Sequence, residues 1–291
     1  MAPTLRLSVL IPATRADGAA GILHRAGLET VLWQDPGDLG TEDDPVPPGR
    51  VRLVGFTGDE AIAARAREDL RARLRARPSL TPFEDQDWLQ KFRAHHRAVR
   101  VGRGLVVAPP WSPVGERPGR IVLRIDPGLA FGTGSHASTY LCLRAIIDRG
   151  RRGPLGRVLD VGTGSGLLAF AALRLGARSA RGIDPDPEAL AAARANARLN
   201  GLGRSLRLAE GTAETARGRY DLVLANLMRD VLIRASQTLA ARVAPGGVLV
   251  VSGILDDQAE DVGQAFSSAG LTLALHRRRE GWSALELVRA R

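Results

Sequence analysis

A glycine-rich turn between an apolar strand and a helix constrains this chain more than any other feature. It is the run VLDVGTGSG at residues 158–166, in which Gly162 and Gly164 leave backbone amides that no side chain shields from a ligand. The dinucleotide-binding fingerprint needs its third glycine one position later, where Leu167 stands. The turn therefore favours a nucleoside ligand without a pyrophosphate. The alternative is a tight strand-to-helix connection that binds nothing.

Strands and helices alternate around this turn. The predicted strands are 158–161, 180–183, 206–209, 222–225, 248–252, 271–276 and 282–288, and the predicted helices are 166–175, 187–200, 230–243 and 256–269. The last two strands are close enough in sequence to form an antiparallel pair. The alternation predicts an α/β fold with a doubly wound, Rossmann-like sheet covered by helices on both faces.

The first 80 residues predict a second, smaller α/β domain of the ferredoxin-like type. Its expected strands are 5–11, 29–33 and 50–55, and its expected helices are 17–26 and 59–77. Asp17 is the expected cap of the first helix and Gly27 its end. Pro78 and Pro82 then interrupt the pattern. We expect an N-terminal domain at 1–80, a linker at 81–119 and the large domain at 120–291.

Polar residues follow two of the predicted strands. Asp184 ends the strand after the glycine turn, at about the distance where nucleotide-binding sheets keep a carboxylate for ribose hydroxyls. Asn226 ends the strand 222–225, at the carboxyl edge where open α/β sheets bind ligands. The alternatives are that Asp184 caps the next helix and that Asn226 caps a loop.

A second glycine-rich loop, DPGLAFGTGSHAST at residues 126–139, leads into a predicted helix at 140–147. Hydroxyls of Ser135, Ser138 and Thr139 can cap that helix. Helix capping does not explain the additional glycines of this loop or its Phe131 and His136.

The net charge narrows the classes of partner, and the cysteine content narrows the kinds of cross-link and metal site. The net charge is +10, and the helix 59–77 has an arginine-rich outer face. The net charge favours nucleic acid, a ribosomal particle or an acidic protein as partner, or else a solvated basic surface without a partner. The arginines of this helix either bind phosphate or form a solvated helix face. The single cysteine, Cys142, excludes an internal disulfide and a cysteine-rich metal site.

Two further patterns bear on metals and on the cellular compartment. His95 and His96 are adjacent and would point in different directions on a helix, so we predict no metal site. No apolar stretch has the length of a signal peptide or a membrane span, so we expect a cytoplasmic protein without membrane contact.

Taken in order, these motifs resemble those of one family, the bacterial PrmA enzymes, which methylate the large-subunit ribosomal protein L11. The resemblance rests on DPGLAFGTGSHAST followed by YLCLRAI, VLDVGTGSGLLAFAALRLGA, GIDPDPEALAAARANARLNG, DLVLANL and VSGIL. It extends from Phe83 to the end of the chain, and the first 80 residues match only in outline. The chain departs from the family pattern at Ser138, where threonine is common, and at Leu227-Met228 after Asn226.

The resemblance implies a protein methyltransferase that uses S-adenosylmethionine. Its donor-binding residues would be Thr139, Gly162, Asp184 and Asn226, with Gly164 added from the same turn. The acceptors would be lysine side chains or the N-terminal amine of a ribosomal protein, which the N-terminal domain presents close to ribosomal RNA. In-line methyl transfer depends mainly on alignment, so no catalytic acid or base is assigned, and the backbone around Asn226 and the loop with His136 are expected to position the amine.

Three other functions stay open. Enzymes that methylate nucleic-acid bases commonly have Pro-Pro and an aromatic residue after this asparagine, whereas Leu227, Met228 and Arg229 follow here. A small-molecule methyltransferase leaves the N-terminal domain without a role. A ribosome-associated binding module with a vestigial donor pocket would fail to bind S-adenosylmethionine.

Overall fold

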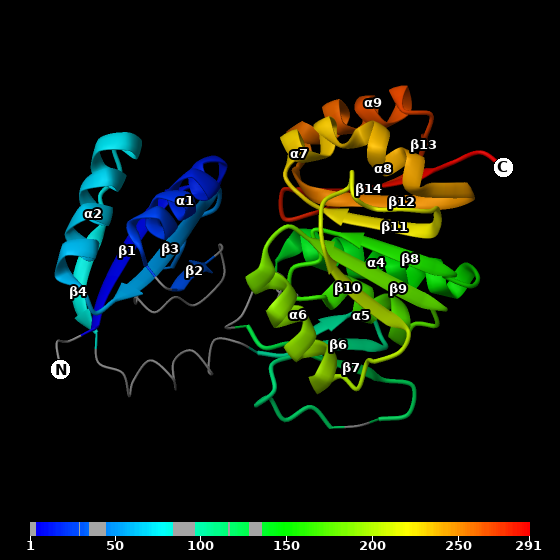
Figure 1. The fold of residues 1–291 in the computed structure, drawn as a ribbon, viewed down its shortest axis with the longest axis horizontal. Helices are drawn as coiled ribbons and strands as arrows, with labels where there is room; N and C mark the ends of the chain where they lie inside the picture. Colours follow the sequence, from blue (N-terminus) through cyan, green and yellow to red (C-terminus); the bar gives the residue numbers. More distant parts are fainter. Residues whose placement is uncertain (1–3, 29, 35–44, 84–96, 116, 128–135) are drawn as a thin grey trace. The chain divides into compact units, whose positions relative to one another are not determined.

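The computed structural model describes residues 4–28, 30–34, 45–83, 97–115, 117–127 and 136–291. Residue contacts divide the chain into two units, Met1–His96 and Arg97–Arg291 (Figure 1). The domain limits expected at 80/81 and 119/120 remain predictions.

The first unit contains a four-stranded antiparallel sheet in the order β2-β3-β1-β4. Its elements are β1 Thr4–Pro12, η1 Ala13–Arg15, α1 Ala16–Ala26, β2 Thr30–Gln34, β3 Arg50–Thr57, α2 Glu60–Leu74 and β4 Ser79–Phe83. Alternate residues of β1, Leu7 and Val9 among them, pack against Leu23 of α1 and Leu70 of α2. The βαββαβ order and this strand order are those of a ferredoxin-like fold.

Two local expectations for this unit were wrong. The N-cap of α1 is Arg15, which makes no side-chain capping hydrogen bond, and Asp17 lies inside the helix. Pro82, expected to interrupt the chain, lies within β4. It is accommodated because β4 is an edge strand that pairs only with β1, so one missing backbone donor can face away from the sheet. Gly27 ends α1 as expected, with φ of 95°.

The second unit has a seven-stranded sheet in the order β10-β9-β8-β11-β12-β14-β13. The strands are β8 Arg157–Val161, β9 Ser179–Asp184, β10 Leu206–Glu210, β11 Tyr220–Asn226, β12 Val243–Leu255, β13 Thr272–Arg279 and β14 Trp282–Val288. All pairs are parallel except those of β14, which runs antiparallel to both neighbours. The chain reverses its direction of winding between β8 and β11, and this confirms the predicted doubly wound sheet.

Helices cover both faces of this sheet (Figure 1). On one face lie α4 Ala137–Arg152, α5 Leu167–Arg174 and α6 Pro187–Leu199; on the other lie α7 Arg229–Arg234, α8 Ser236–Arg242 and, after η2 Asp256–Gln258, α9 Ala259–Ser268. Successive residues of β11 alternate between the faces: Leu224 packs in the cluster of Phe170, and Val223 in the cluster of Phe266. The helix predicted at 230–243 is two short helices that meet at Ala235.

A small three-stranded sheet precedes the large one. It is formed by β5 Val99–Val101, β6 Leu105–Ala108 and β7 Ile121–Arg124. Its inner face, with Val101, Leu105 and Leu123, joins the core that contains Cys142 of α4. The segment expected as a linker thus contributes two strands to the second unit. Within the residues that the structure describes, no helix is long and apolar enough to cross a membrane.

Candidate functional site

The glycine turn follows β8 at the point where the sheet changes its direction of winding. Gly162, Gly164 and Gly166 have φ values of 68°, 53° and 86°, which other residues rarely adopt. The amides of Gly162 and Thr163 donate to the Ile183 carbonyl at 2.9 and 3.0 Å, so the turn is held against the end of β9. A side chain at position 162 would also collide with Leu227 Cδ2. Backbone geometry and packing both require glycine there.

Asp184 ends β9 and contacts this turn directly. Its Oδ2 accepts a hydrogen bond from the Gly164 amide at 2.9 Å, and its Oδ1 accepts one from the Asp186 amide at 3.0 Å. The N-cap of α6 is Asp186, which accepts from the Glu188 amide, so the capping alternative for Asp184 is wrong. An ionised carboxylate has about four lone-pair positions, so capacity remains for two hydroxyl donors.

Asn226 ends β11 and meets the first turn of α4. Its Nδ2 donates to Thr139 Oγ1 at 3.3 Å, joining positions 87 residues apart in the chain. Thr139 is buried and Asn226 is half-buried. Within the described part of the chain, the Asn226 side chain makes no hydrogen bond to a loop, which removes the loop-capping alternative. Its Oδ1 is left to accept from a ligand.

The two pairs lie around one edge of the sheet. Strand β8 pairs with β9 on one side and with β11 on the other. Leu227, next to Asn226, packs over Gly162. The structure therefore brings the five predicted residues together at the carboxyl edge, where open α/β sheets bind ligands. They are Thr139, Gly162, Gly164, Asp184 and Asn226.

Asp160 adds an unsatisfied carboxylate oxygen beside the same turn. Its Oδ2 accepts from Thr163 Oγ1 at 2.7 Å and from the Ala169 amide at 3.1 Å, while Oδ1 has no partner within the described residues. Burial raises the pKa of the Asp160 carboxyl to about 6. A buried acceptor without a donor is rare in proteins and is costly. Its charge and position suit a cationic ligand group.

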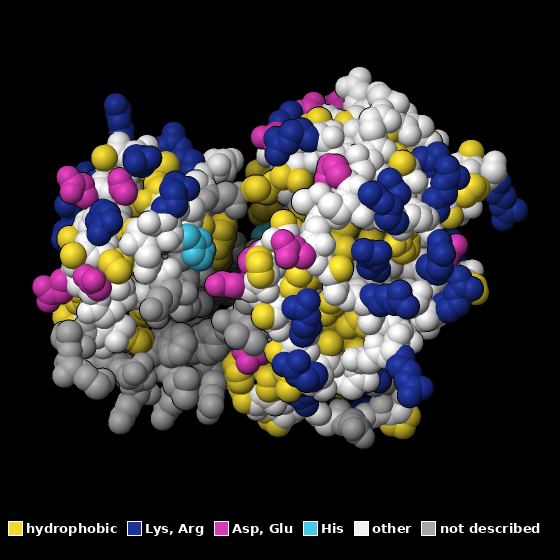
Figure 2. All heavy atoms as spheres, in the orientation of Figure 1, with side chains coloured by type: hydrophobic (Ala, Val, Ile, Leu, Met, Phe, Trp, Pro, Cys, Tyr) yellow, Lys and Arg dark blue, Asp and Glu magenta, His cyan; other side chains and the backbone are white. Residues whose placement is uncertain are grey.

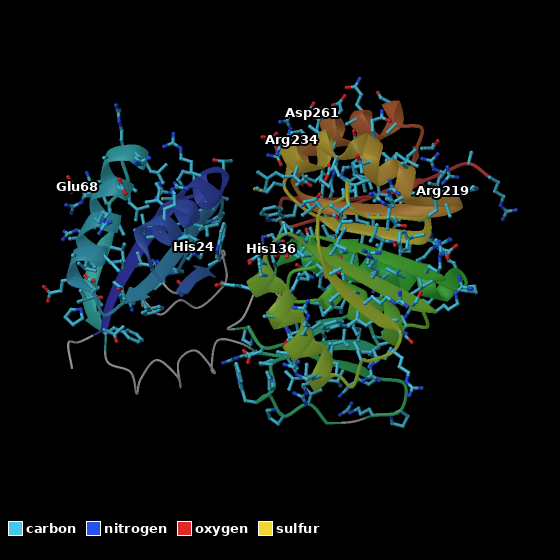
Figure 3. The ribbon with its side chains drawn as sticks, viewed as in Figure 1. His24, Glu68, His136, Arg219, Arg234 and Asp261 are labelled. Atoms are coloured by element: carbon cyan, nitrogen blue, oxygen red, sulfur yellow. The ribbon has the colours of Figure 1, made fainter. Side chains whose placement is uncertain are left out.

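His136 caps α4 and contacts an aromatic residue. Its Nδ1 accepts from the Ser138 amide at 3.3 Å and lies 2.7 Å from Ser138 Oγ. The prediction that hydroxyls of Ser138 and Thr139 cap this helix was wrong, because both lie inside it. The His136 ring (Figure 3) packs edge-on against Trp282 with centroids 4.4 Å apart. Ser135 and Phe131 lie outside the described residues.

Two buried asparagines, Asn196 in α6 and Asn200 at its C-cap, hold the segments around the turn, and the sequence patterns gave them no role. Asn196 accepts from the Asp126 amide at 2.9 Å and donates to the Ser165 carbonyl at 3.2 Å. Asn200 accepts from the Arg124 amide at 2.8 Å and donates to its carbonyl at 2.6 Å. Their spacing of four residues places them on one helix face, which was the available signal.

No metal-binding cluster of three or more His, Cys, Asp or Glu residues occurs in the described parts of the chain. His95 and His96 lie outside those parts. The site therefore consists of a glycine turn, two carboxylates, an amide and a hydroxyl.

Comparison with known proteins adds the family. The family model of ribosomal protein L11 methyltransferase (PrmA) matches residues 4–290. A protein named ribosomal protein L11 methyltransferase from Geobacter metallireducens is 44% identical over 210 residues, 72% of this chain and 69% of that protein. One of the same name from Syntrophotalea carbinolica is 37% identical over 302 residues, covering 97% of this chain and 96% of that protein.

A solved structure agrees with these relatives. The crystal structure of ribosomal protein L11 methylase from Lactobacillus delbrueckii subsp. bulgaricus is 31% identical with a TM-score of 0.61, and the match covers 67% of this chain and 98% of that one. The family match covers nearly the whole chain, including the first unit, where the motifs agreed only in outline. The chain belongs to the ribosomal protein L11 methyltransferase (PrmA) family.

Proposed function

We propose that this chain transfers methyl groups from S-adenosylmethionine to amino groups of ribosomal protein L11, on lysine side chains, the N-terminal amine or both. The observation that carries the proposal is the hydrogen bond from the Gly164 amide to Asp184, which joins a glycine turn and a carboxylate at the switch point of the sheet. Membership of the L11 methyltransferase family supports the choice of substrate.

The residues at the edge of the sheet fit the methyl donor. S-adenosylmethionine supplies an electrophilic methyl group on a positively charged sulfonium. Asp184 would accept the ribose hydroxyls with its remaining lone pairs. The backbone of the glycine turn, which has no side chain at Gly162 or Gly164, would lie against the nucleoside, while the amides of both glycines hold the turn against the end of β9. The negative charge of Asp160, whose buried Oδ1 has no partner within the described residues, would attract the positive charge of the donor. Thr139 and Asn226 would close the opposite side of the site.

The acceptor amine needs alignment and must be neutral. An ammonium loses its proton more easily where burial removes water and a cation lies nearby. Asn226 and His136 are both half-buried, and we propose that Asn226 Oδ1 orients the amine while the His136–Trp282 pair limits access of water. These residues act by positioning, so no strong acid or base is required.

The first unit has a role in this proposal. All five proposed donor residues lie in the second unit, so the ferredoxin-like unit is free to present the protein substrate. We expect the enzyme to act in the cytoplasm, where ribosomal proteins are made.

The experiment is transfer of radiolabelled methyl groups from S-adenosylmethionine to free L11, to ribosomal RNA and to a mixture of ribosomal proteins. The proposal expects label on amino groups of L11 with the native chain and little with Asp184→Ala. Label in RNA would instead establish a base methyltransferase. Donor binding without label in any acceptor would contradict the proposed substrate, and lack of donor binding would favour a non-catalytic binding module.

A further inference from the structure

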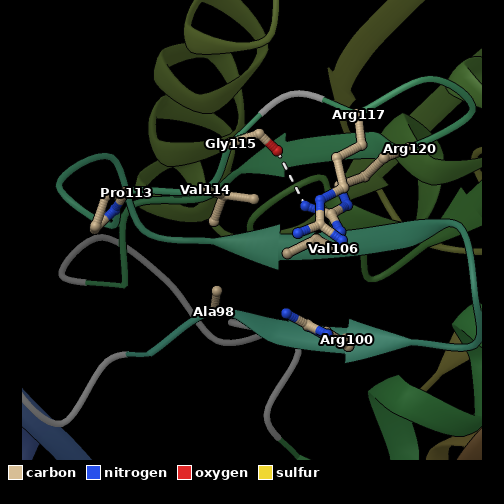
Figure 4. A pocket seen from close by; sticks show the side chains of 8 residues that line it. All are labelled: Ala98, Arg100, Val106, Pro113, Val114, Gly115, Arg117 and Arg120. Atoms are coloured by element: carbon tan, nitrogen blue, oxygen red, sulfur yellow. Dashed lines mark hydrogen bonds between the residues drawn. The ribbon is translucent and has the colours of Figure 1, made fainter.

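The outer face of the small β5-β6-β7 sheet forms a pocket of about 310 Å³ (Figure 4). Strand alternation places Val101 and Leu105 in the core and turns Arg100 and Val106 outward, where the two are paired across the strands. The loop between β6 and β7 lies over this face. The pocket is therefore bounded by the outward-facing side chains of β5 and β6 and by this loop. None of its lining residues belongs to the proposed methyl-transfer site.

Three guanidinium groups and an apolar wall line the pocket. The arginines are Arg100, Arg117 and Arg120, and the apolar residues are Val106, Pro113 and Val114. Arg120 donates to the Gly115 carbonyl at 3.0 Å, which fixes its position. In the described part of the chain none of the three arginines forms an ion pair. Three like charges around one cavity favour an anionic occupant.

The loop that forms the pocket wall is anchored at both ends. Arg124 of β7 donates to the carbonyls of Pro109 and Ser112 at 3.0 and 2.6 Å. At the other end the Ile121 amide donates to the Gly104 carbonyl at 2.7 Å. These hydrogen bonds hold the described parts of the loop in place, which lowers the entropy that a ligand must offset when it binds.

The positive charge extends beyond the pocket. The segment 97–125 contains one acidic residue, Glu116, which lies outside the described residues, and six arginines: Arg97, Arg100, Arg103, Arg117, Arg120 and Arg124. Arg103 is exposed at the turn between β5 and β6. Figure 2 also shows basic side chains spread over the visible face of the second unit. Such an extended field suits a ligand with repeated charges.

We propose that this pocket binds the backbone phosphate of single-stranded RNA. A guanidinium matches a phosphate with two parallel hydrogen bonds, and the exposed Pro113 and half-buried Val114 offer an apolar surface to the sugar or base. A polynucleotide continues with further charges toward Arg103. This binding goes beyond methyl transfer and does not depend on it.

The test uses the full-length chain and a fluorescein-labelled 12-nucleotide single-stranded RNA of mixed sequence. Binding is measured by fluorescence anisotropy at several salt concentrations for the native chain, for Arg100→Gln/Arg117→Gln and for Arg204→Gln/Arg207→Gln. The last pair removes two exposed arginines near and in β10 and is the matched control. Thermal unfolding of all three proteins verifies that they are folded.

The pocket variant should bind RNA at least about tenfold more weakly than the native chain, and the control should stay close to it. The slope of log affinity against log salt should become shallower by roughly 1.4 in the pocket variant, since each phosphate contact on a single strand contributes about 0.7. Equal losses in both variants, or no RNA binding, would overturn the proposal. So would equally strong competition by inorganic phosphate or by a 12-residue polyglutamate, because either would identify a general anion site.

Discussion

Asp160 is a buried carboxylate with one oxygen that has no hydrogen-bond partner among the described residues, and its raised pKa makes stability depend on pH. The folded chain keeps this proton up to about pH 6, whereas the unfolded chain loses it near the ordinary pKa of an aspartate, 3.8. The folded state therefore binds more protons between these values, and stability falls as pH rises through them. The loss is about 3 kcal/mol, at 1.36 kcal/mol for each pKa unit.

We therefore predict opposite effects of Asp160→Asn on stability and on ligand binding. The neutral amide should raise the melting temperature at pH 7.5 and flatten the stability profile between pH 4 and 6. Affinity for S-adenosylmethionine should fall, because a negative charge facing a cation is lost. Thermal unfolding against pH and calorimetric titration measure the two effects. Asp257→Asn, at an exposed position, is the control, and an unchanged profile in Asp160→Asn would contradict the argument.

Asp184 and Asp186 provide a matched pair of carboxylates. Asp184→Ala should weaken donor binding by about 10- to 100-fold, the range for loss of hydrogen bonds to a charged group. Asp186→Ala removes the N-cap of α6 and should cost about 1 kcal/mol of stability with little effect on the donor. Isothermal titration with S-adenosylhomocysteine and thermal unfolding separate these results. Equal donor affinity in the two variants would contradict the role of Asp184.

At the scale of elements, α6 connects the glycine turn to the strand ahead of the sheet. Asn196→Ala and Asn200→Ala should each destabilise the chain by roughly 2–4 kcal/mol, because buried backbone groups lose their partners. Only Asn196 contacts the turn, through the Ser165 carbonyl, so only Asn196→Ala should also lower donor affinity. Urea unfolding and donor titration test this difference. Similar donor affinities would show that the turn keeps its shape without the hydrogen bond from Asn196 to the Ser165 carbonyl.

Hydrophobic periodicity predicted the large sheet well. The strands and the glycine turn were found from local patterns, and Asp184 and Asn226 from their places at strand ends. Strand β4 was missed because Pro82 is a strand breaker in most contexts, and its edge position depends on pairing with the distant β1. The bonds of Asn196 could not be predicted, since Asp126 lies 70 residues away. Strand β4 and the hydrogen bonds of Asn196 depend on contacts between residues far apart in the sequence, which local patterns do not show.

At the scale of the whole molecule, the two units should separate substrate recognition from donor binding. All five proposed donor residues lie in Arg97–Arg291. The truncated chain 97–291 should therefore bind S-adenosylhomocysteine with native affinity but methylate L11 at least about tenfold more slowly. Calorimetry and radiolabel transfer measure these properties. Full activity of the truncated chain would show that the first unit does not present the substrate.

The single cysteine has a practical consequence for measuring motion in the second unit. Cys142 is fully buried, and burial raises the pKa of its thiol to about 12, so a thiol reagent should react only after the unit opens. With the reagent in excess, the labelling rate should reach a plateau equal to the opening rate. A bound donor should lower labelling at limiting reagent. The labelling rate of Cys142 therefore measures how fast the core opens, and it also detects donor binding without a methyl-transfer assay.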